Sequence, residues 1–202
     1  MALVIDGKAL FLHVPKTGGL FVTNFLKGRT KQVGYRHSHI NLVGTVAYSN
    51  VFKFCFIRPP DEWYRSYWQM KMKFKNSWFY YEPKTLYHPN WEIDPSCGSD
   101  DLNEFVRNCA EKNGYLVRMY KQFIYGHGTQ VNFVGRTETI KQDLATVLNY
   151  VGIPFSKGKL NRQPKFNKSP RTQTLTEETR KLILFAEKEY YNLPYGFIPT
   201  QT

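Results

Sequence analysis

Short apolar runs alternate along the chain with segments whose apolar residues recur at helical spacing. Residues 9–14 form one such run, and residues 19–27 follow it with the spacing of an amphipathic helix. Residues 52–57 form a second run, and residues 63–74 follow as a second helical segment. Each pair predicts a buried strand, a loop and a helix.

A third unit of this kind lies in the second half of the chain. Residues 131–135 predict a strand, Thr137 is placed to cap a helix, and the apolar positions of that helix share one face: Ile140, Leu144, Val147, Leu148 and Val151. Strands that alternate with helices favour a mostly parallel sheet covered on both faces. The predicted fold class is therefore α/β, a three-layer domain with a central parallel sheet.

The segments outside these units are less regular. Residues 76–98 are rich in aromatic side chains and contain three prolines, which predicts an ordered loop or lid. Two helices are predicted, over residues 101–112 and 115–125, and a basic loop is predicted over residues 161–171. A final amphipathic helix is predicted to start at Thr176 and to end near residue 190. Because no repeat or linker interrupts the pattern, we expect residues 1–202 to form one domain.

The composition narrows the class of partner. Subtracting 16 acidic from 28 basic residues leaves a net charge of +12 at pH 7, which favours an anionic partner: a nucleotide, a nucleic acid, a sulfated glycan or an acidic membrane surface. Residues 1–14 carry Asp6 and Lys8 and lack the apolar stretch of a signal peptide, and no later run approaches membrane-spanning length. We therefore expect a cytoplasmic protein without a membrane span.

The three cysteines show no metal-binding spacing, and their odd number argues against a disulfide framework. Cys55 lies inside an apolar run, so we expect a buried core residue rather than a reactive thiol. Cys97 and Cys109 would pair only in an oxidising compartment. No metal site is expected.

The loop after the first predicted strand has the composition of an anion site. It reads His13-Val-Pro-Lys-Thr-Gly-Gly19 and leads into a helix, where backbone amides, glycines and Lys16 can surround a phosphate. A basic loop before an ordinary helix would have the same composition. The order differs from that of nucleotide triphosphatases, in which the lysine follows the last glycine, because Lys16 here precedes Gly18.

A second candidate site begins where residues 52–57 end. Arg58 stands at the predicted strand end, and Ser66 lies eight residues later on the next helix, so both could reach one phosphate. Taken singly, Arg58 could instead pair with Asp61 or Glu62, and Ser66 could be a solvated helix residue.

Together these segments resemble the PAPS-dependent sulfotransferases, in particular the carbohydrate O-sulfotransferase branch that includes heparan sulfate 2-O-sulfotransferase. PAPS is 3′-phosphoadenosine 5′-phosphosulfate. The resemblance implies a fold like that of the P-loop nucleotide kinases and a reaction that moves a sulfuryl group from PAPS to an acceptor hydroxyl, expected on a glycan. It implies no metal and no nucleic acid partner. It covers most of the α/β framework but not residues 76–130.

The resemblance also implies roles for individual residues. The loop residues would bind the 5′-phosphosulfate, with Lys16 also stabilising the leaving group: Pro15, Lys16, Thr17, Gly18 and Gly19. Arg58 and Ser66 would bind the 3′-phosphate. Residues of a later basic loop would cover the nucleotide: Lys165, Asn167, Lys168 and Ser169. Residues 133–138 resemble a third recurrent segment, a strand running into a helix beneath the cofactor. Leu20, Phe21 and Trp63 depart from the family pattern, since relatives often have hydroxyl residues at the first two positions and arginine at the third.

A His-x-His segment lies between the two cofactor motifs. It resembles a segment of the 2-O-sulfotransferase branch in which the second histidine is the base, which makes His39 the expected base and His37 a secondary catalytic candidate. Surface histidines beside Arg36 could also be merely solvated. Glu138 is an alternative base, although capping is the commoner role for a carboxylate at a helix start.

The aromatic segment could shape the acceptor site. Four of its side chains are candidates for stacking on sugar rings or other planar acceptors: Trp78, Tyr80, Tyr81 and Trp91. They could equally form the small core of the loop itself. Asp143, Glu187 and Glu189 are expected to be solvated helix residues. Two alternative functions stay open, a nucleotide kinase-like phosphotransferase and a non-catalytic basic module for nucleic acid or sulfated glycan.

Overall fold

The computed structural model describes residues 2–33, 50–73, 92–93, 96–126, 130–164 and 173–198. Backbone contacts divide the chain into two compact units. We call the first the sheet unit (Met1–Arg58, Tyr120–Asn167 and Pro194–Thr202) and the second the helical unit (Pro59–Met119 and Lys168–Leu193). The expectation of one domain over residues 1–202 stays a prediction.

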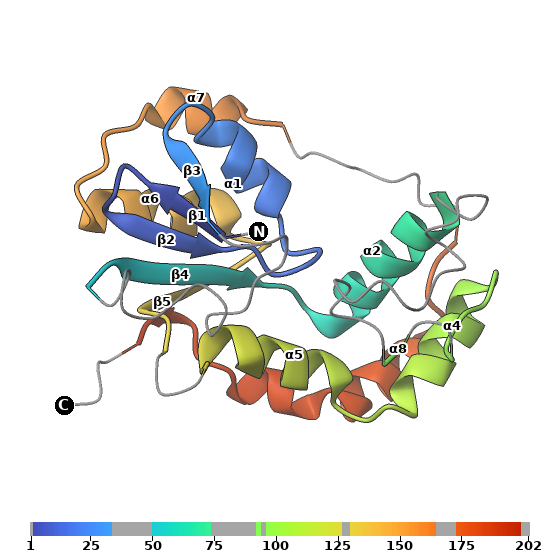
Figure 1. The fold of residues 1–202 in the computed structure, drawn as a ribbon. Coiled ribbons are helices and arrows are strands. Elements are labelled where there is room, and N and C mark those ends of the chain that lie inside the picture. The colour runs from blue at the N-terminus through green and yellow to red at the C-terminus, as the bar shows by residue number, and fades with distance from the viewer. Residues whose placement is uncertain are drawn as a thin grey trace. The chain divides into compact units, whose positions relative to one another are not determined.

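The sheet unit contains a six-stranded sheet in the order β3-β1-β2-β4-β5-β6 (Figure 1). The three central strands are parallel to one another: β2 (Ala9–Leu12), β4 (Phe52–Ile57) and β5 (Phe133–Arg136). The three outer strands run antiparallel to their neighbours: β1 (Ala2–Ile5), β3 (Thr30–Val33) and β6 (Gly196–Phe197). The α/β class with a parallel centre is confirmed, and the complete sheet is mixed.

A tight hairpin connects β1 to β2. Asp6 and Gly7 have φ angles of 47° and 70°, and the Lys8 amide donates to the Ile5 carbonyl at 2.9 Å. Aspartate followed by glycine is a frequent pair where two consecutive residues need positive φ. This turn places β1 beside β2 and so adds an antiparallel strand that the sequence interpretation did not include.

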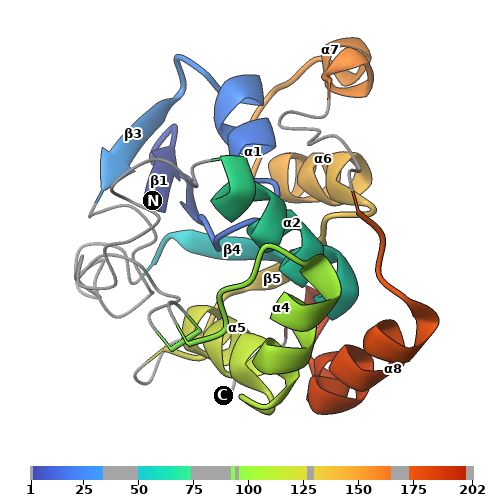
Figure 2. The same ribbon diagram turned by 90° about the vertical axis from the view of Figure 1, so that its right-hand side faces the viewer.

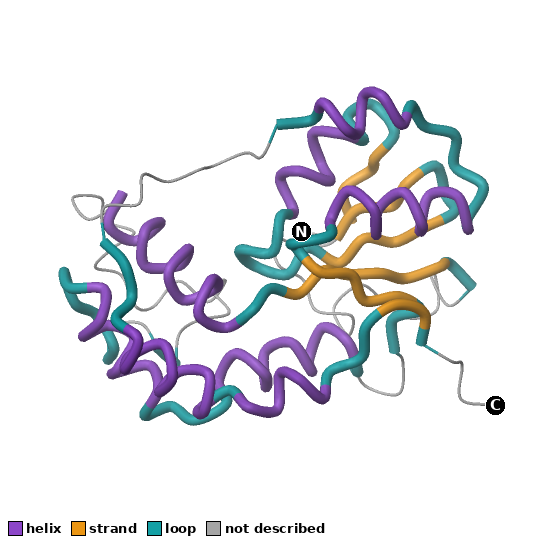
Figure 3. The backbone as a smooth tube through the Cα atoms, turned by 180° about the vertical axis from the view of Figure 1, so that it is seen from behind, coloured by secondary structure: helices purple, strands orange, loops and turns teal. Residues whose placement is uncertain are grey.

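Helices cover both faces of the sheet within this unit (Figures 1 and 3). On one side lie α1 (Gly19–Phe25), α6 (Ile140–Tyr150) and α7 (Lys157–Arg162). Their apolar side chains pack on alternate strand residues, among them Leu3, Ile5, Phe11, Phe54, Phe56 and Phe133. On the other side lies the end of α5 (Tyr115–Ile124), from Tyr120 onward. The parallel strands are buried from both sides, which explains their continuous apolar sequence.

The helical unit packs three helices against one another, α2 (Pro60–Lys73), α4 (Leu102–Ala110) and α8 (Glu177–Ala186) (Figure 2). Its core is aromatic, with the rings of Trp63 and Tyr67 stacked at a centroid distance of 5.0 Å. Thr176 caps α8 as predicted, accepting from the Thr179 amide at 3.2 Å. The predicted final helix ends earlier than expected, and the 3-10 helix η2 (Lys188–Asn192) follows it.

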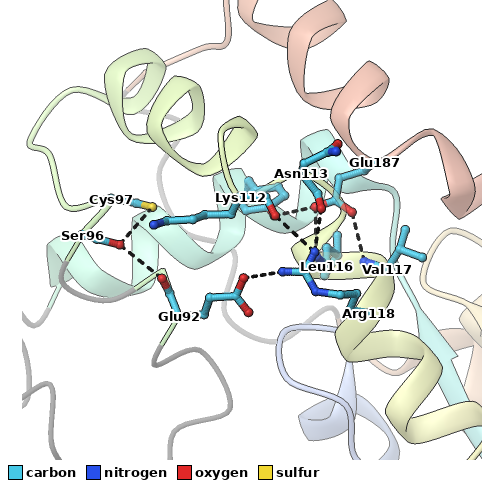
Figure 4. A network of polar contacts seen from close by, with 10 residues as sticks. Glu92, Ser96, Cys97, Lys112, Asn113, Leu116, Val117, Arg118 and Glu187 are labelled. Carbon is cyan, nitrogen blue, oxygen red and sulfur yellow. Dashed lines mark hydrogen bonds and ion pairs between the residues drawn. The ribbon is translucent and has the colours of Figure 1, made fainter.

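Glu187, expected to be solvated, is instead buried in the helical unit. Its carboxylate accepts from the Tyr64 hydroxyl at 2.7 Å. It also accepts from the amides of Leu116 and Val117 at 2.9 and 3.0 Å (Figure 4). The carboxylate therefore satisfies first-turn amides of α5, which have no helical acceptor. In the same network Arg118 pairs with Glu92.

No helix in the described part of the chain is both long enough and apolar enough to cross a membrane.

Candidate functional site

The candidate phosphate loop connects β2 to α1. Lys16 has a φ of 64° and Gly18 a φ of 85°, so the backbone enters the left-handed region twice within three residues. The Thr17 hydroxyl is buried and donates to the Val14 carbonyl at 2.9 Å. Thr17 thereby fixes the loop against the strand end, and its hydroxyl is already engaged in that bond.

Four consecutive amides of this loop remain available to a ligand. Among the described residues, the N–H groups of Thr17, Gly18, Gly19 and Leu20 donate to no acceptor, and the first amide of α1 to find one is that of Phe21. Backbone amides grouped in this way bind anions. The glycines in this stretch also allow close packing: a Cβ at Gly19 would lie 1.8 Å from the His13 ring.

Arg58 lies at the same edge of the sheet as this loop. It follows β4, which pairs in parallel with β2 at Leu12 and Cys55, so both strands end at one edge. The Arg58 Nη1 donates to the Lys16 carbonyl at 3.3 Å. The structure thus brings together the two motifs that the sequence analysis singled out, 42 residues apart.

Tyr120, which the sequence analysis did not identify, holds the backbone of Arg58. Its buried hydroxyl donates to the Arg58 carbonyl at 2.9 Å and accepts from the Arg58 amide at 3.2 Å. One phenol therefore satisfies both backbone groups where β4 ends. The interaction joins residues 62 positions apart, so no local pattern would have revealed it.

Ser66 is a half-buried residue of α2 in the helical unit, and its role beside Arg58 stays a prediction. The two carboxylates considered as alternative partners of Arg58 have other partners. Asp61 pairs with Arg180 at 2.8 Å, and Glu62 pairs with Arg65.

The third segment, β5 running into α6, also reaches this edge. The Thr137 amide donates to the Ile57 carbonyl at 3.0 Å. The predicted helix cap at Thr137 is wrong: α6 begins at Ile140 and its N-cap residue is Thr139, whose hydroxyl donates to Asp143 Oδ2 at 2.7 Å instead of accepting from an amide. Glu138 is exposed and accepts from the Thr137 hydroxyl at 2.9 Å.

Asp143 was expected to be solvated, and the structure buries it. Its Oδ2 accepts from the Arg136 amide at 2.8 Å, and its Oδ1 accepts from the Tyr195 hydroxyl at 3.0 Å. This carboxylate joins the end of β5 to α6 and to the chain before β6. The expectation failed because helical periodicity does not reveal that this acid accepts from the end of the preceding strand and from Tyr195, 52 residues away.

Several candidate residues lie outside the described residues. They are the two histidines, His37 and His39, the aromatic residues Trp78, Tyr80, Tyr81 and Trp91, and the basic-loop residues Lys165, Asn167, Lys168 and Ser169. Their roles stay predictions.

The described cysteines and acids provide little reactive or metal-binding chemistry. Cys55, Cys97 and Cys109 are buried, and burial raises the pKa of the Cys55 thiol to about 12, which keeps it protonated. Burial also lowers the pKa of Lys53. Across the described ranges, no group of three or more His, Cys, Asp or Glu side chains could hold a metal ion.

Comparison with known proteins identifies the class. The model of the Sulfotransferase family matches residues 5–192, nearly the whole chain. The chain belongs to this family, and it is a transferase that moves sulfuryl groups. Searches of curated proteins and of solved structures each found no significant match.

Proposed function

We propose that this sulfotransferase takes its sulfuryl group from PAPS and transfers it to a hydroxyl group of a carbohydrate. The observation that carries the proposal is the hydrogen bond from Arg58 Nη1 to the Lys16 carbonyl. It supports a site in which a loop suited to the 5′-phosphosulfate and an arginine suited to the 3′-phosphate act on one nucleotide. A donor with phosphates at both ends of its ribose needs this arrangement.

The chemistry requires little beyond positioning and charge. The acceptor oxygen attacks sulfur, the bond from sulfur to the 5′-phosphate oxygen breaks, and adenosine 3′,5′-bisphosphate leaves. Negative charge develops on that phosphate oxygen, where Lys16 and the free loop amides would stabilise it. Arg58 and Ser66 would hold the 3′-phosphate, and the basic loop with Lys165, Asn167, Lys168 and Ser169 would cover the nucleotide.

The acceptor hydroxyl needs a base to take its proton. We assign this role to His39, with His37 orienting the acceptor. Comparing the turnover of His39→Ala with that of Glu138→Gln tests the assignment, because only the variant that lacks the base should lose most of its turnover. A positioned base contributes on the order of a hundred- to ten-thousandfold in rate. Aromatic rings at Trp78, Tyr80, Tyr81 and Trp91 would contact the sugar, and the net charge of +12 suits an anionic glycan.

Adenosine 3′,5′-bisphosphate tests the donor directly. A hundredfold excess over the dissociation constant should stabilise the fold by about 2.7 kcal/mol. For 202 residues this raises the melting temperature by roughly 5–11 °C. Arg58→Ala should reduce the shift, whereas Arg29→Ala, at the opposite sheet edge and paired with Asp6, should not.

Two results would contradict the proposal. A shift with ATP and magnesium but none with the bisphosphate would indicate a phosphotransferase. Binding of RNA or heparin with no nucleotide effect would indicate a basic binding module.

A further inference from the structure

Arg136 lies at the same sheet edge as the phosphate loop, one strand beyond Arg58. It is the last residue of β5 and stands opposite Ile57 in the register of β4 and β5. The segment after it contacts the loop closely. A Cβ at Gly18 would lie 2.5 Å from Ile140 Cδ1 and 3.9 Å from Thr137 Cγ2.

The guanidinium of Arg136 has no hydrogen-bond acceptor among the described residues. Its Nε is fully buried and makes no hydrogen bond, and its central carbon lies 4.7 Å from the centroid of the Tyr195 ring. Asp143 is near in sequence, but its oxygens accept from the Arg136 backbone amide, from Thr139 and from Tyr195. The acid therefore fixes the backbone beside the guanidinium and the Tyr195 ring, but in the described structure it makes no hydrogen bond or ion pair with the guanidinium itself.

Arg136 as a residue is only partly buried, but its enclosed Nε loses hydration and gains no bond in exchange, which is unfavourable. An arriving anion would give the other N–H groups of the guanidinium an acceptor. The planar guanidinium suits phosphate, which it can bind through two parallel N–H groups. Stacking on Tyr195 holds that plane in place before the anion binds.

We propose that Arg136 binds the 3′-phosphate of the nucleotide donor together with Arg58. The assignment rests on the proposed function, and the order of strands supports it. The phosphosulfate loop follows β2, Arg58 follows β4, and Arg136 ends β5, so Arg136 lies on the far side of Arg58 from the loop. This strand order favours the 3′-phosphate over the sulfuryl group as the ligand of Arg136.

Calorimetric titration of Arg136→Met tests this assignment. Adenosine 3′,5′-bisphosphate should bind about ten- to a hundredfold more weakly than to the wild type, as expected for loss of hydrogen bonds to a charged group. Adenosine 5′-monophosphate, which lacks the 3′-phosphate, should bind both proteins within about threefold. Arg29→Gln is the matched control, since its guanidinium is already paired with Asp6.

The melting temperature without ligand gives a second readout. If Arg136 serves binding, replacing its unsatisfied charge by methionine should leave the melting temperature unchanged or raise it. If it serves only packing on Tyr195, the melting temperature should fall. Should Arg136→Met fail to fold, Arg136→Gln provides the same comparison of the two nucleotides.

The outcomes separate this inference from the function on which it rests. Equal bisphosphate affinity in wild type and variant, or an equal loss for both nucleotides, overturns the role of Arg136 and leaves the donor assignment intact. No bisphosphate binding by the wild type overturns both.

Discussion

A methyl group added at Gly19 should disturb the phosphate loop through a single steric contact. The ideal Cβ at this position would lie 1.8 Å from His13 Cδ2 and 1.9 Å from His13 Nε2. His13 is 9% exposed and stacks at 6.0 Å on Phe11, so its ring cannot turn freely into solvent. Either the loop or the ring must move in Gly19→Ala.

The size of the effect follows from two opposing contributions. Overpacking a buried site costs about 1–3 kcal/mol, and a contact this short belongs near the upper end. Alanine in a helix is favoured over glycine by roughly 0.5–1 kcal/mol, which offsets part of the cost. The φ of Gly19 lies outside the left-handed region, so no backbone strain is added. We expect a net loss of about 2 kcal/mol, or roughly 4–8 °C in melting temperature.

A double-mutant cycle with His13→Ala isolates this contact. Removing the ring should relieve the clash, so Gly19→Ala should cost at least about 1 kcal/mol less in that background. Gly7→Ala is the control: its φ is +70° and a Cβ there meets nothing within 4 Å, so its cost of about 1–2 kcal/mol should not depend on His13.

The loop variant should also bind adenosine 3′,5′-bisphosphate more weakly, because the amides of residues 17–20 would move away from the proposed position of the 5′-phosphate. Gly7→Ala should bind the nucleotide normally. Strictly additive stabilities for Gly19→Ala and His13→Ala would refute the reasoning, since they would mean that the ring does not restrain the loop.

Two further predictions concern buried hydroxyl and carboxylate groups. Tyr120→Phe should destabilise the fold by about 1–3 kcal/mol and weaken bisphosphate binding, because both backbone groups of Arg58 lose their partner. Tyr64→Phe is the control, since it removes a buried hydroxyl bonded to Glu187 and should lower stability without changing bisphosphate affinity. Equal bisphosphate affinities in the two variants would contradict the role of Tyr120. Burial raises the pKa of Glu187 despite the bonds it accepts, so the stability of the wild type relative to Glu187→Gln should be greatest at low pH and fall as pH rises through the Glu187 pKa. Thermal unfolding at about pH 4 and about pH 7.5 measures this, and a wild-type advantage that grows with pH would show that the sign is wrong.

The three strand, loop and helix units could be predicted because each carries its own signals. A continuous apolar run marks a strand buried on both faces, and prolines or glycines mark its end. For β4 the predicted and observed bounds coincide at Phe52 and Ile57. These units also allowed the candidate site to be located from the sequence, since Lys16 and Arg58 both follow parallel strands.

The outer strands were missed for a different reason. β1, β3 and β6 are two to four residues long, and unlike β2 and β5, which are also four residues long, they belong to no strand, loop and helix unit of the predicted pattern. One signal was present: Asp6 and Gly7 separate two apolar runs, as in many hairpins. Read that way, residues 2–12 would have indicated an antiparallel pair at the edge of the sheet.

The buried polar residues that sequence reasoning missed depend on partners far away in the chain. Tyr120 meets Arg58 across 62 positions, and Glu187 meets Tyr64 across 123. Both lie on helices or helix ends where a polar residue ordinarily faces solvent. Only the folded chain reveals that their polar atoms are enclosed and bonded.

The total charge gives less information about an anion site than the pairing of individual cations. Among the described residues, four arginines each pair with a carboxylate: Arg29, Arg65, Arg118 and Arg180. Their charge is largely compensated, and surface pairs of this kind contribute little to binding. Arg136 differs because its buried Nε makes no hydrogen bond in the described structure. In the proposed function, the basic surface as a whole would attract the nucleotide, whereas the Arg136 guanidinium and the loop amides, which have no acceptor among the described residues, would set the position of its phosphates.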